Sequence, residues 1–111
     1  MSDFEVNVAQ ARELAAAGAV LVDVREAEEW AAGYAPESVH IPMAELPEEF
    51  DSLPEEKVIV VVCRTGARSA HATGFLVQQG YDARNLVGGL VAWAADGLPL
   101  VTDAGAPGVV I

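Results

Sequence analysis

The most informative stretch of the chain spans residues 58–69 and reads Val58-Ile59-Val60-Val61-Val62-Cys63-Arg64-Thr65-Gly66-Ala67-Arg68-Ser69. The five residues before the cysteine are apolar and β-branched, which is typical of a strand that is buried on both faces of a parallel sheet. Glycine and polar residues follow, and they predict a tight loop. An apolar stripe at Ala72, Phe75 and Leu76 then indicates a helix that ends at Gly80. Strand, loop and helix in this order are typical of an α/β fold.

The rest of the chain continues the alternation of strands and helices. Residues 19–24 form a second, largely apolar run, and residues 84–87 predict a shorter strand. Four more helices are expected from capping residues, prolines and glycines: Asn7 to Gly18, 26–32, Pro47 to just before Pro54, and 90–95. We therefore expect one α/β domain.

Composition restricts the compartment and the class of partner. The chain has 111 residues, of which 52% are hydrophobic and 21% are charged, as in one globular domain. The first residues lack a basic and apolar leader, and no run is long enough for a membrane span, so a cytoplasmic location is expected. A formal net charge of −11 disfavours nucleic acid and anionic membranes as partners. The single cysteine fits a reducing compartment and excludes a disulfide within the chain.

Cys63 lies where the buried strand ends and the helix begins, at the edge where parallel sheets bind their ligands. Taken alone, a single cysteine behind five apolar residues is more often an inert buried side chain. The loop after it favours a reactive thiolate instead. Backbone N–H groups, the N-terminus of the helix and the guanidinium groups of Arg64 and Arg68 all stabilise negative charge on the sulfur. We therefore predict that Cys63 is a catalytic nucleophile.

The other residues of the loop are expected to hold an anionic substrate. Two arginines in one short loop stand out in an acidic chain, and a planar guanidinium can bind sulfonate-like oxygens through two hydrogen bonds. The remaining residues would act mainly through backbone N–H groups, although Ser69 could equally be an ordinary helix cap. The predicted substrate-binding residues are Arg64, Thr65, Gly66, Ala67, Arg68 and Ser69. Asp23 and Arg25, at the end of the other buried strand, are expected to brace the site by hydrogen bonds.

No metal site and no cofactor are expected. The only two histidines, His40 and His71, have neither the spacing nor the patterned carboxylates of a metal site. His71 lies early in the helix after Cys63 and is most simply a surface residue. Gly88-Gly89 predicts a tight turn before the last helix, but the lysine and glycine spacing of a phosphate-binding loop are absent.

Four stretches of the chain resemble, in order and spacing, a single-domain rhodanese, a sulfurtransferase of the thiosulfate:cyanide type. They are Leu21-Val22-Asp23-Val24-Arg25-Glu26 with Glu28-Glu29-Trp30 and Gly33; Val39-His40-Ile41-Pro42; the Cys63 loop; and Asn85-Leu86-Val87-Gly88-Gly89-Leu90 with Ala92-Trp93 and Gly97-Leu98-Pro99. The resemblance implies a rhodanese-like α/β domain at residues 1–100, with a mainly parallel sheet of about five strands and helices on both faces. Residues 101–111 lie beyond it, as a C-terminal tail without an assigned role.

One stretch departs from the family pattern. Residues 33–38 read Gly-Tyr-Ala-Pro-Glu-Ser, where members of the family usually read Gly-His-Ile-Pro-Gly-Ala. The departure affects a loop at the rim of the expected site and leaves the Cys63 loop unchanged.

The resemblance also implies the chemistry. The Cys63 thiolate would take a sulfane sulfur from a small anionic donor such as thiosulfate, hold it as a persulfide, and pass it to a thiophilic acceptor such as cyanide or a thiol. The alternative is a protein-to-protein sulfur carrier or regulatory module with little small-molecule turnover, whose partner would be a sulfur-relay protein. A phosphatase is less compatible with the loop. Its related folds have five residues between cysteine and arginine, whereas Arg68 comes one residue too early and position 69 is serine.

Overall fold

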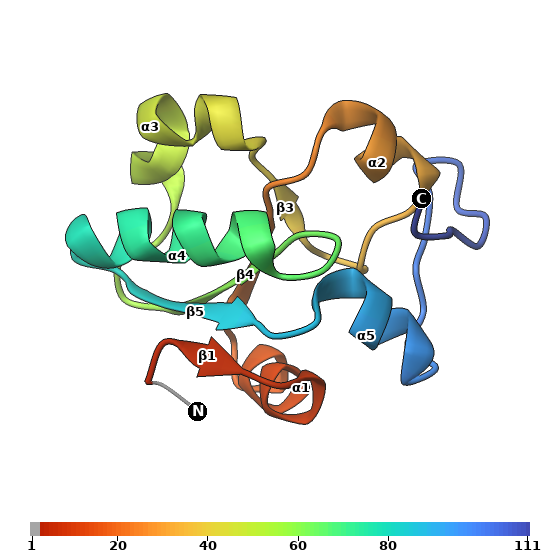
Figure 1. Cartoon of the computed structure of the whole chain (residues 1–111), viewed down its shortest axis with the longest axis horizontal. Helices are drawn as coiled ribbons and strands as arrows, with labels where there is room; N and C mark the ends of the chain where they lie inside the picture. Colours follow the sequence, from red (N-terminus) through yellow and green to blue (C-terminus); the bar gives the residue numbers. More distant parts are fainter. Residues whose placement is uncertain (1–2) are drawn as a thin grey trace.

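A sheet of five parallel strands forms the centre of the computed structural model, which describes residues 3–111 (Figure 1). The strands are β1 Glu5–Val6, β2 Val20–Asp23, β3 Val39–His40, β4 Val58–Val62 and β5 Asp82–Leu86. They lie in the order β1-β5-β4-β2-β3, and each neighbouring pair is parallel. The strand that precedes Cys63 is therefore in the middle of the sheet, and the carboxyl ends of all five strands share one edge.

Helices and short 3-10 segments connect the strands. The α-helices are α1 Val8–Ala16, α2 Ala27–Ala32, α3 Leu46–Glu49, α4 Ala67–Gln78 and α5 Gly89–Ala95, and the 3-10 helices are η1 Met43–Glu45 and η2 Phe50–Ser52. The start of α1 has the expected capping box. Asn7 Oδ1 accepts a hydrogen bond from Gln10 N, and the Gln10 side chain accepts one from Asn7 N.

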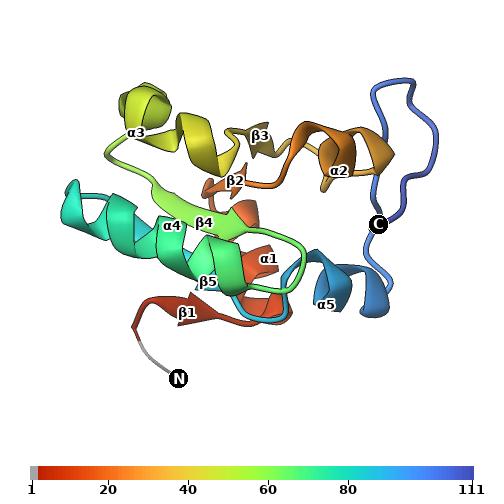
Figure 2. The same ribbon diagram turned by 45° about the horizontal axis from the view of Figure 1, so that its top comes forward.

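Helices cover both faces of the sheet (Figure 2). Successive residues of β4 accordingly point into two different cores. Ile59, Val61 and Cys63 pack in the core that α3 and α4 cover. Val60 and Val62 pack in the opposite core, which α1 and α5 cover. Burial on both faces explains the unbroken apolar run of this strand.

The predicted fold class is confirmed, and the differences concern the ends of elements. The strand predicted at 84–87 begins two residues earlier, since Asp82 already pairs with Val58. The edge strands β1 and β3 have only two residues each, too few for an apolar pattern to indicate them. The helix expected from Pro47 begins earlier and is divided into η1, α3 and η2. None of the helices within residues 3–111 has the length and apolar character needed to cross a bilayer.

The tail at 101–111 folds back against α2, and both views place it there (Figures 1 and 2). Tyr34 and Val101 exchange two backbone hydrogen bonds of 3.0 and 2.9 Å, and Val109 N donates to Ala32 O at 2.9 Å. The Tyr34 hydroxyl also donates to Asp103 Oδ1 at 2.7 Å. Tyr34 belongs to the stretch that departs from the family pattern, so this stretch is also the one on which the tail packs.

Candidate active site

Cys63 follows β4 directly, and its side chain is almost completely buried, with 1% of its surface exposed. Residues 64–66 form a short loop, and α4 begins at Ala67. Gly66 precedes the helix with a φ of 107°, the left-handed conformation expected of a curled loop at this glycine. The loop brings the sulfur to the N-terminal end of α4, where the helix dipole favours negative charge.

Hydrogen-bond donors from the loop and the first turn of α4 converge on the sulfur. Gly66 N lies 3.1 Å from Cys63 Sγ, Ser69 N 3.4 Å and Ser69 Oγ 3.2 Å. Burial raises the pKa of Cys63, but the hydrogen bonds from the Ser69 hydroxyl and from the backbone N–H groups of Ser69, Gly66 and Thr65 outweigh it. The pKa of the thiol is therefore lowered from its ordinary value, which increases the fraction of thiolate at neutral pH.

The N-terminus of α5 holds the same loop from the other side. Leu90 N donates to the carbonyl oxygen of Cys63 at 2.9 Å, and Val91 N donates to that of Arg64 at 3.0 Å. Gly89, with a φ of 60°, makes this approach possible, because a Cβ atom there would lie 2.5 Å from Arg64 O. The tight turn predicted at Gly88-Gly89 thus positions a second helix against the backbone of the Cys63 loop.

Asn85 is a residue of this site that the sequence reasoning missed. Asn85 belongs to β5 and is 6% exposed. Its Nδ2 donates to Gly66 O at 3.1 Å. Its Oδ1 accepts a hydrogen bond from Ser69 Oγ at 2.5 Å. Asn85 is opposite Val61 of β4 in the sheet register. The available signal was an amide side chain in a strand next to the cysteine strand, where a buried polar group needs partners.

Within residues 3–111, neither of the two loop arginines forms a hydrogen bond with the sulfur. Arg68 instead forms two hydrogen bonds with Glu29 of α2, of 2.7 and 2.8 Å. These bonds lower the pKa of Glu29 to about 2 and raise that of Arg68, so the pair is ionised at neutral pH. Arg64 Nε donates to the backbone oxygen of Ile111 at 3.0 Å. Each arginine is thus held by a neighbouring segment at the rim of the site.

Asp23, the last residue of β2, and Arg25 form a fully buried ion pair. Arg25 Nε and Nη2 donate to the Asp23 carboxylate at distances of 2.8 to 3.1 Å, and Nη2 also donates to Gly33 O at 2.7 Å. His40 Nε2 lies 2.8 Å from Arg25 O. The pair therefore ties the end of β2 to the C-terminal end of α2. In the sheet beside it, Val24 N donates to the oxygen of Val62, the residue before Cys63.

Aromatic rings stack beside this ion pair. Trp30 lies parallel to Tyr34 with a centroid distance of 3.8 Å and parallel to His40 with a distance of 4.6 Å. His71 is exposed on α4. No group of three or more His, Cys, Asp or Glu side chains within residues 3–111 is arranged to hold a metal ion.

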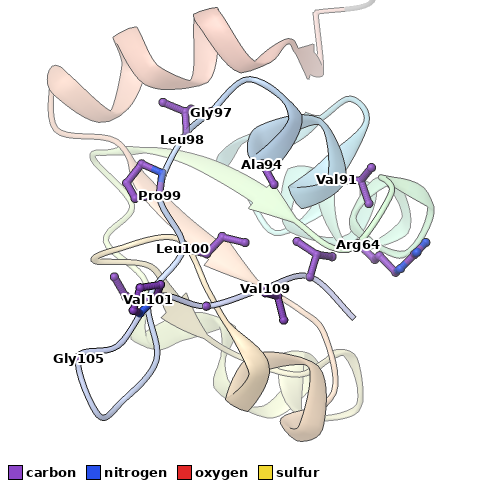
Figure 3. A pocket seen from close by; sticks show the side chains of 13 residues that line it. Arg64, Val91, Ala94, Gly97, Leu98, Pro99, Leu100, Val101, Gly105 and Val109 are labelled. Atoms are coloured by element: carbon purple, nitrogen blue, oxygen red, sulfur yellow. The ribbon is translucent and has the colours of Figure 1, made fainter.

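A surface pocket of about 830 Å³ lies between α5 and the tail (Figure 3). Its lining is mostly apolar and includes Val91, Leu98, Leu100 and Val109, and Arg64 lies at its edge. Cys63 does not line this pocket. The pocket therefore adjoins the loop without containing the sulfur.

A family model for the rhodanese-like domain matches residues 7–96, which include every residue of the Cys63 site. The chain belongs to the rhodanese-like domain family. A sulfurtransferase of Allochromatium vinosum is 42% identical over 87 residues, which cover 78% of this chain and 81% of that protein. The thiosulfate sulfurtransferase GlpE of Pseudomonas savastanoi is 36% identical over 97 residues, which cover 86% of this chain and 92% of that protein.

Solved structures of rhodanese-like proteins have the same architecture. The crystal structure of a rhodanese-related protein from Thermoplasma volcanium superposes with a TM-score of 0.84 at 35% identity and covers 89% of this chain and 98% of that chain. A rhodanese-like domain protein from Staphylococcus aureus gives a TM-score of 0.74 at 33% identity, with 80% and 89% of the two chains covered. The resemblance inferred from the sequence is therefore confirmed at the level of the family and the fold.

Proposed function

We propose that the protein is a sulfurtransferase that moves a sulfane sulfur from a small anionic donor such as thiosulfate to cyanide or a thiol, through a persulfide on Cys63. The observation that carries the proposal is the convergence of the Gly66 and Ser69 donors on Cys63 Sγ at the start of α4. These donors stabilise a thiolate, which is the nucleophilic form of cysteine. The names of the relatives, sulfurtransferase and thiosulfate sulfurtransferase, support the same reaction class.

The reaction would proceed in two steps through a covalent intermediate. The Cys63 thiolate attacks the outer sulfur of thiosulfate, the S–S bond of the donor breaks, and sulfite leaves with the bonding electron pair. The outer sulfur of the resulting persulfide carries the negative charge. Cyanide or a thiolate then attacks this sulfur, and the Cys63 thiolate is released for the next cycle. No cofactor is needed, because each step exchanges one sulfur bond for another.

The anionic donor would be held mainly by the backbone. The first N–H groups of a helix have no partner within the helix, so those of Ala67 and Arg68 can face a bound anion together with those of Thr65 and Gly66. Arg68 contributes its charge from the rim in a pair with Glu29. Arg64, whose Nε donates to the oxygen of Ile111, has no acidic side chain as an ion-pair partner within residues 3–111, and we propose that it also contributes to donor binding.

The position of Arg68 argues against phosphate-ester chemistry. A Cys-based phosphatase needs an arginine that points into the loop and binds the oxygens of the phosphoryl group. Here the Arg68 guanidinium faces Glu29, and the residue that contacts the sulfur at the expected arginine position is Ser69. A serine hydroxyl at this position cannot supply the two parallel hydrogen bonds that an arginine makes to a phosphate.

Turnover by the purified protein tests this proposal. With thiosulfate and cyanide, the protein should form thiocyanate catalytically, whereas Cys63→Ser should form none and aryl phosphates should not be hydrolysed. A single equivalent of transferred sulfur without further turnover would favour the carrier function over the enzyme. Thiocyanate formation by Cys63→Ser at the rate of the unmodified chain would contradict both.

A further inference from the structure

Asn85 contacts both residues that donate hydrogen bonds to the sulfur. Its Nδ2 donates to Gly66 O at 3.1 Å, and its Oδ1 accepts from Ser69 Oγ at 2.5 Å. The bond to Gly66 determines the orientation of the amide, because only the NH2 group can donate to a carbonyl oxygen. Oδ1 is therefore fixed as an acceptor that faces the Ser69 hydroxyl in a buried part of the site.

The Ser69 hydroxyl has one proton and two acceptors. Its oxygen lies 3.2 Å from Cys63 Sγ and 2.5 Å from Asn85 Oδ1. One O–H group cannot donate to both acceptors with good geometry, and the shorter contact is the one to Asn85. When Cys63 is a neutral thiol, its S–H can donate to Ser69 Oγ while the hydroxyl donates to Asn85, so every group has a partner.

Ionisation of the thiol breaks this arrangement. The thiolate has no proton to donate, and it gains the Ser69 hydroxyl as a further donor only if the hydroxyl turns away from Asn85. Asn85 Oδ1 then loses its donor in a buried position, which is costly for a polar atom. The two acceptors thus compete for one proton.

We propose that Asn85 is a positioning residue for Cys63, which competes with the sulfur for the single hydroxyl proton of Ser69 and so limits how strongly Ser69 stabilises the thiolate. The proposal rests on the proposed function in assigning the nucleophile to Cys63. A less stabilised thiolate is a stronger nucleophile. After sulfur transfer the negative charge moves to the outer sulfur, and the hydroxyl can return to Asn85. Asn85 therefore favours the persulfide over the free thiolate.

Charged groups on the neighbouring elements act on the sulfur independently of this competition. They are Arg64 in the loop, Arg68 of α4 with Glu29 of α2, and the Asp23–Arg25 pair at the end of β2. Glu5 of β1 is opposite Asn85 in the sheet register. No hydrogen bond or ion pair within the described chain joins Arg64, the Arg68–Glu29 pair or the Asp23–Arg25 pair to Ser69 or Asn85. Substitution of Asn85 should therefore leave their charges in place.

The test compares Asn85→Val, Ser69→Ala and the double variant in the full chain. The apparent pKa of Cys63 is measured from the pH dependence of its alkylation by iodoacetamide. Asn85→Val should lower this pKa by about 0.5–1 unit, the effect of one hydrogen bond on the thiolate. Ser69→Ala should raise it, and Asn85→Val should have no further effect in the Ser69→Ala background.

Two results would overturn the proposal. A higher pKa in Asn85→Val would mean that Asn85 only braces Gly66, because a loosened loop loses donors to the thiolate. An equal shift with and without the Ser69 hydroxyl would mean that Asn85 does not act through Ser69. If Asn85→Val does not fold, Asn85→Ala removes the same two bonds without added bulk and gives the same test of sign. Alkylation uses no sulfur donor, so a protein without sulfurtransferase turnover would still answer this question.

Discussion

Glu37 is the one non-glycine residue with a positive φ within residues 3–111, at 67°. It lies in the stretch that departs from the family pattern, at the position where the family usually has glycine. A non-glycine residue in the left-handed region costs about 1–2 kcal/mol of stability. Glycine avoids this strain, but it loses more conformational entropy on folding, so only part of the gain remains. Glu37→Gly should therefore raise the free energy of unfolding by about 0.5–1 kcal/mol in urea titrations. Glu37→Gln removes the charge and keeps the backbone strain, so an equal gain in this control would refute the explanation.

The Glu29–Arg68 pair makes a prediction about acid stability. The pKa of Glu29 is about 2 in the folded chain, whereas a glutamate without these partners has a pKa of 4.5. A lowered folded pKa stabilises the fold above the unfolded pKa, and this stabilisation is lost as the pH falls from about 4.5 to 2. In urea titrations across this range, Glu29→Gln should lose less stability than the unmodified chain. Glu28→Gln, an exposed neighbour on the same helix, should behave like the unmodified chain. Identical pH profiles for all three proteins would show that the ion pair does not persist in solution.

At the level of residues, the type of chemistry can be predicted from the sequence more readily than the contacts between side chains. The Cys63 loop was recognisable because one cysteine, one glycine and two arginines follow a buried strand. The directions of the arginine side chains were not, since Glu29 and Ile111 are distant from them in sequence and only the fold brings them together. Asn85 was overlooked for the same reason. Its partners Gly66 and Ser69 are 19 and 16 residues away, and no local pattern links them.

At the level of elements, the contact between α5 and the Cys63 loop gives a third prediction. Gly89→Ala places a Cβ atom 2.5 Å from Arg64 O at a φ of 60°, and should cost about 2–4 kcal/mol of stability from strain and overpacking. Gly97→Ala is the matched control, because its φ is also positive, at 81°, and no atom lies within 4 Å of the new Cβ. It should cost only about 1 kcal/mol. Thermal or urea unfolding measures both, and equal costs would mean that α5 does not press on the loop.

The elements themselves were predictable where the pattern extends over several residues. The apolar runs of β2 and β4 and the capping signals of α1 determine where these elements lie. The pattern fails at β1 and β3, which have two residues each and exist because a neighbouring strand offers its edge. It also fails between residues 43 and 52, where three short helical segments follow one another without a repeated apolar face.

At the level of the whole molecule, the sheet order and the place of the tail depend on packing. The strand order follows from parallel crossovers, which local sequence patterns do not encode, so the family resemblance predicts a mainly parallel sheet of about five strands but not their order. The tail lies beyond that resemblance. It nevertheless reaches the site, because it packs on α2 and ends beside Arg64. The chain has a net charge of −11, and two of the groups that donate hydrogen bonds to Cys63 Sγ are the uncharged backbone N–H groups of Gly66 and Ser69.

Intact mass measurement of the whole chain, before and after incubation with thiosulfate, tests the central claim most directly. The account predicts that the reduced protein gains the mass of one sulfur atom, that fragmentation places this sulfur on Cys63, and that cyanide removes it with formation of thiocyanate. Cys63→Ser should keep its original mass under the same conditions. An unchanged mass of the unmodified chain, or an equal gain of sulfur by Cys63→Ser, would contradict the assignment of Cys63 as the residue that carries the sulfur.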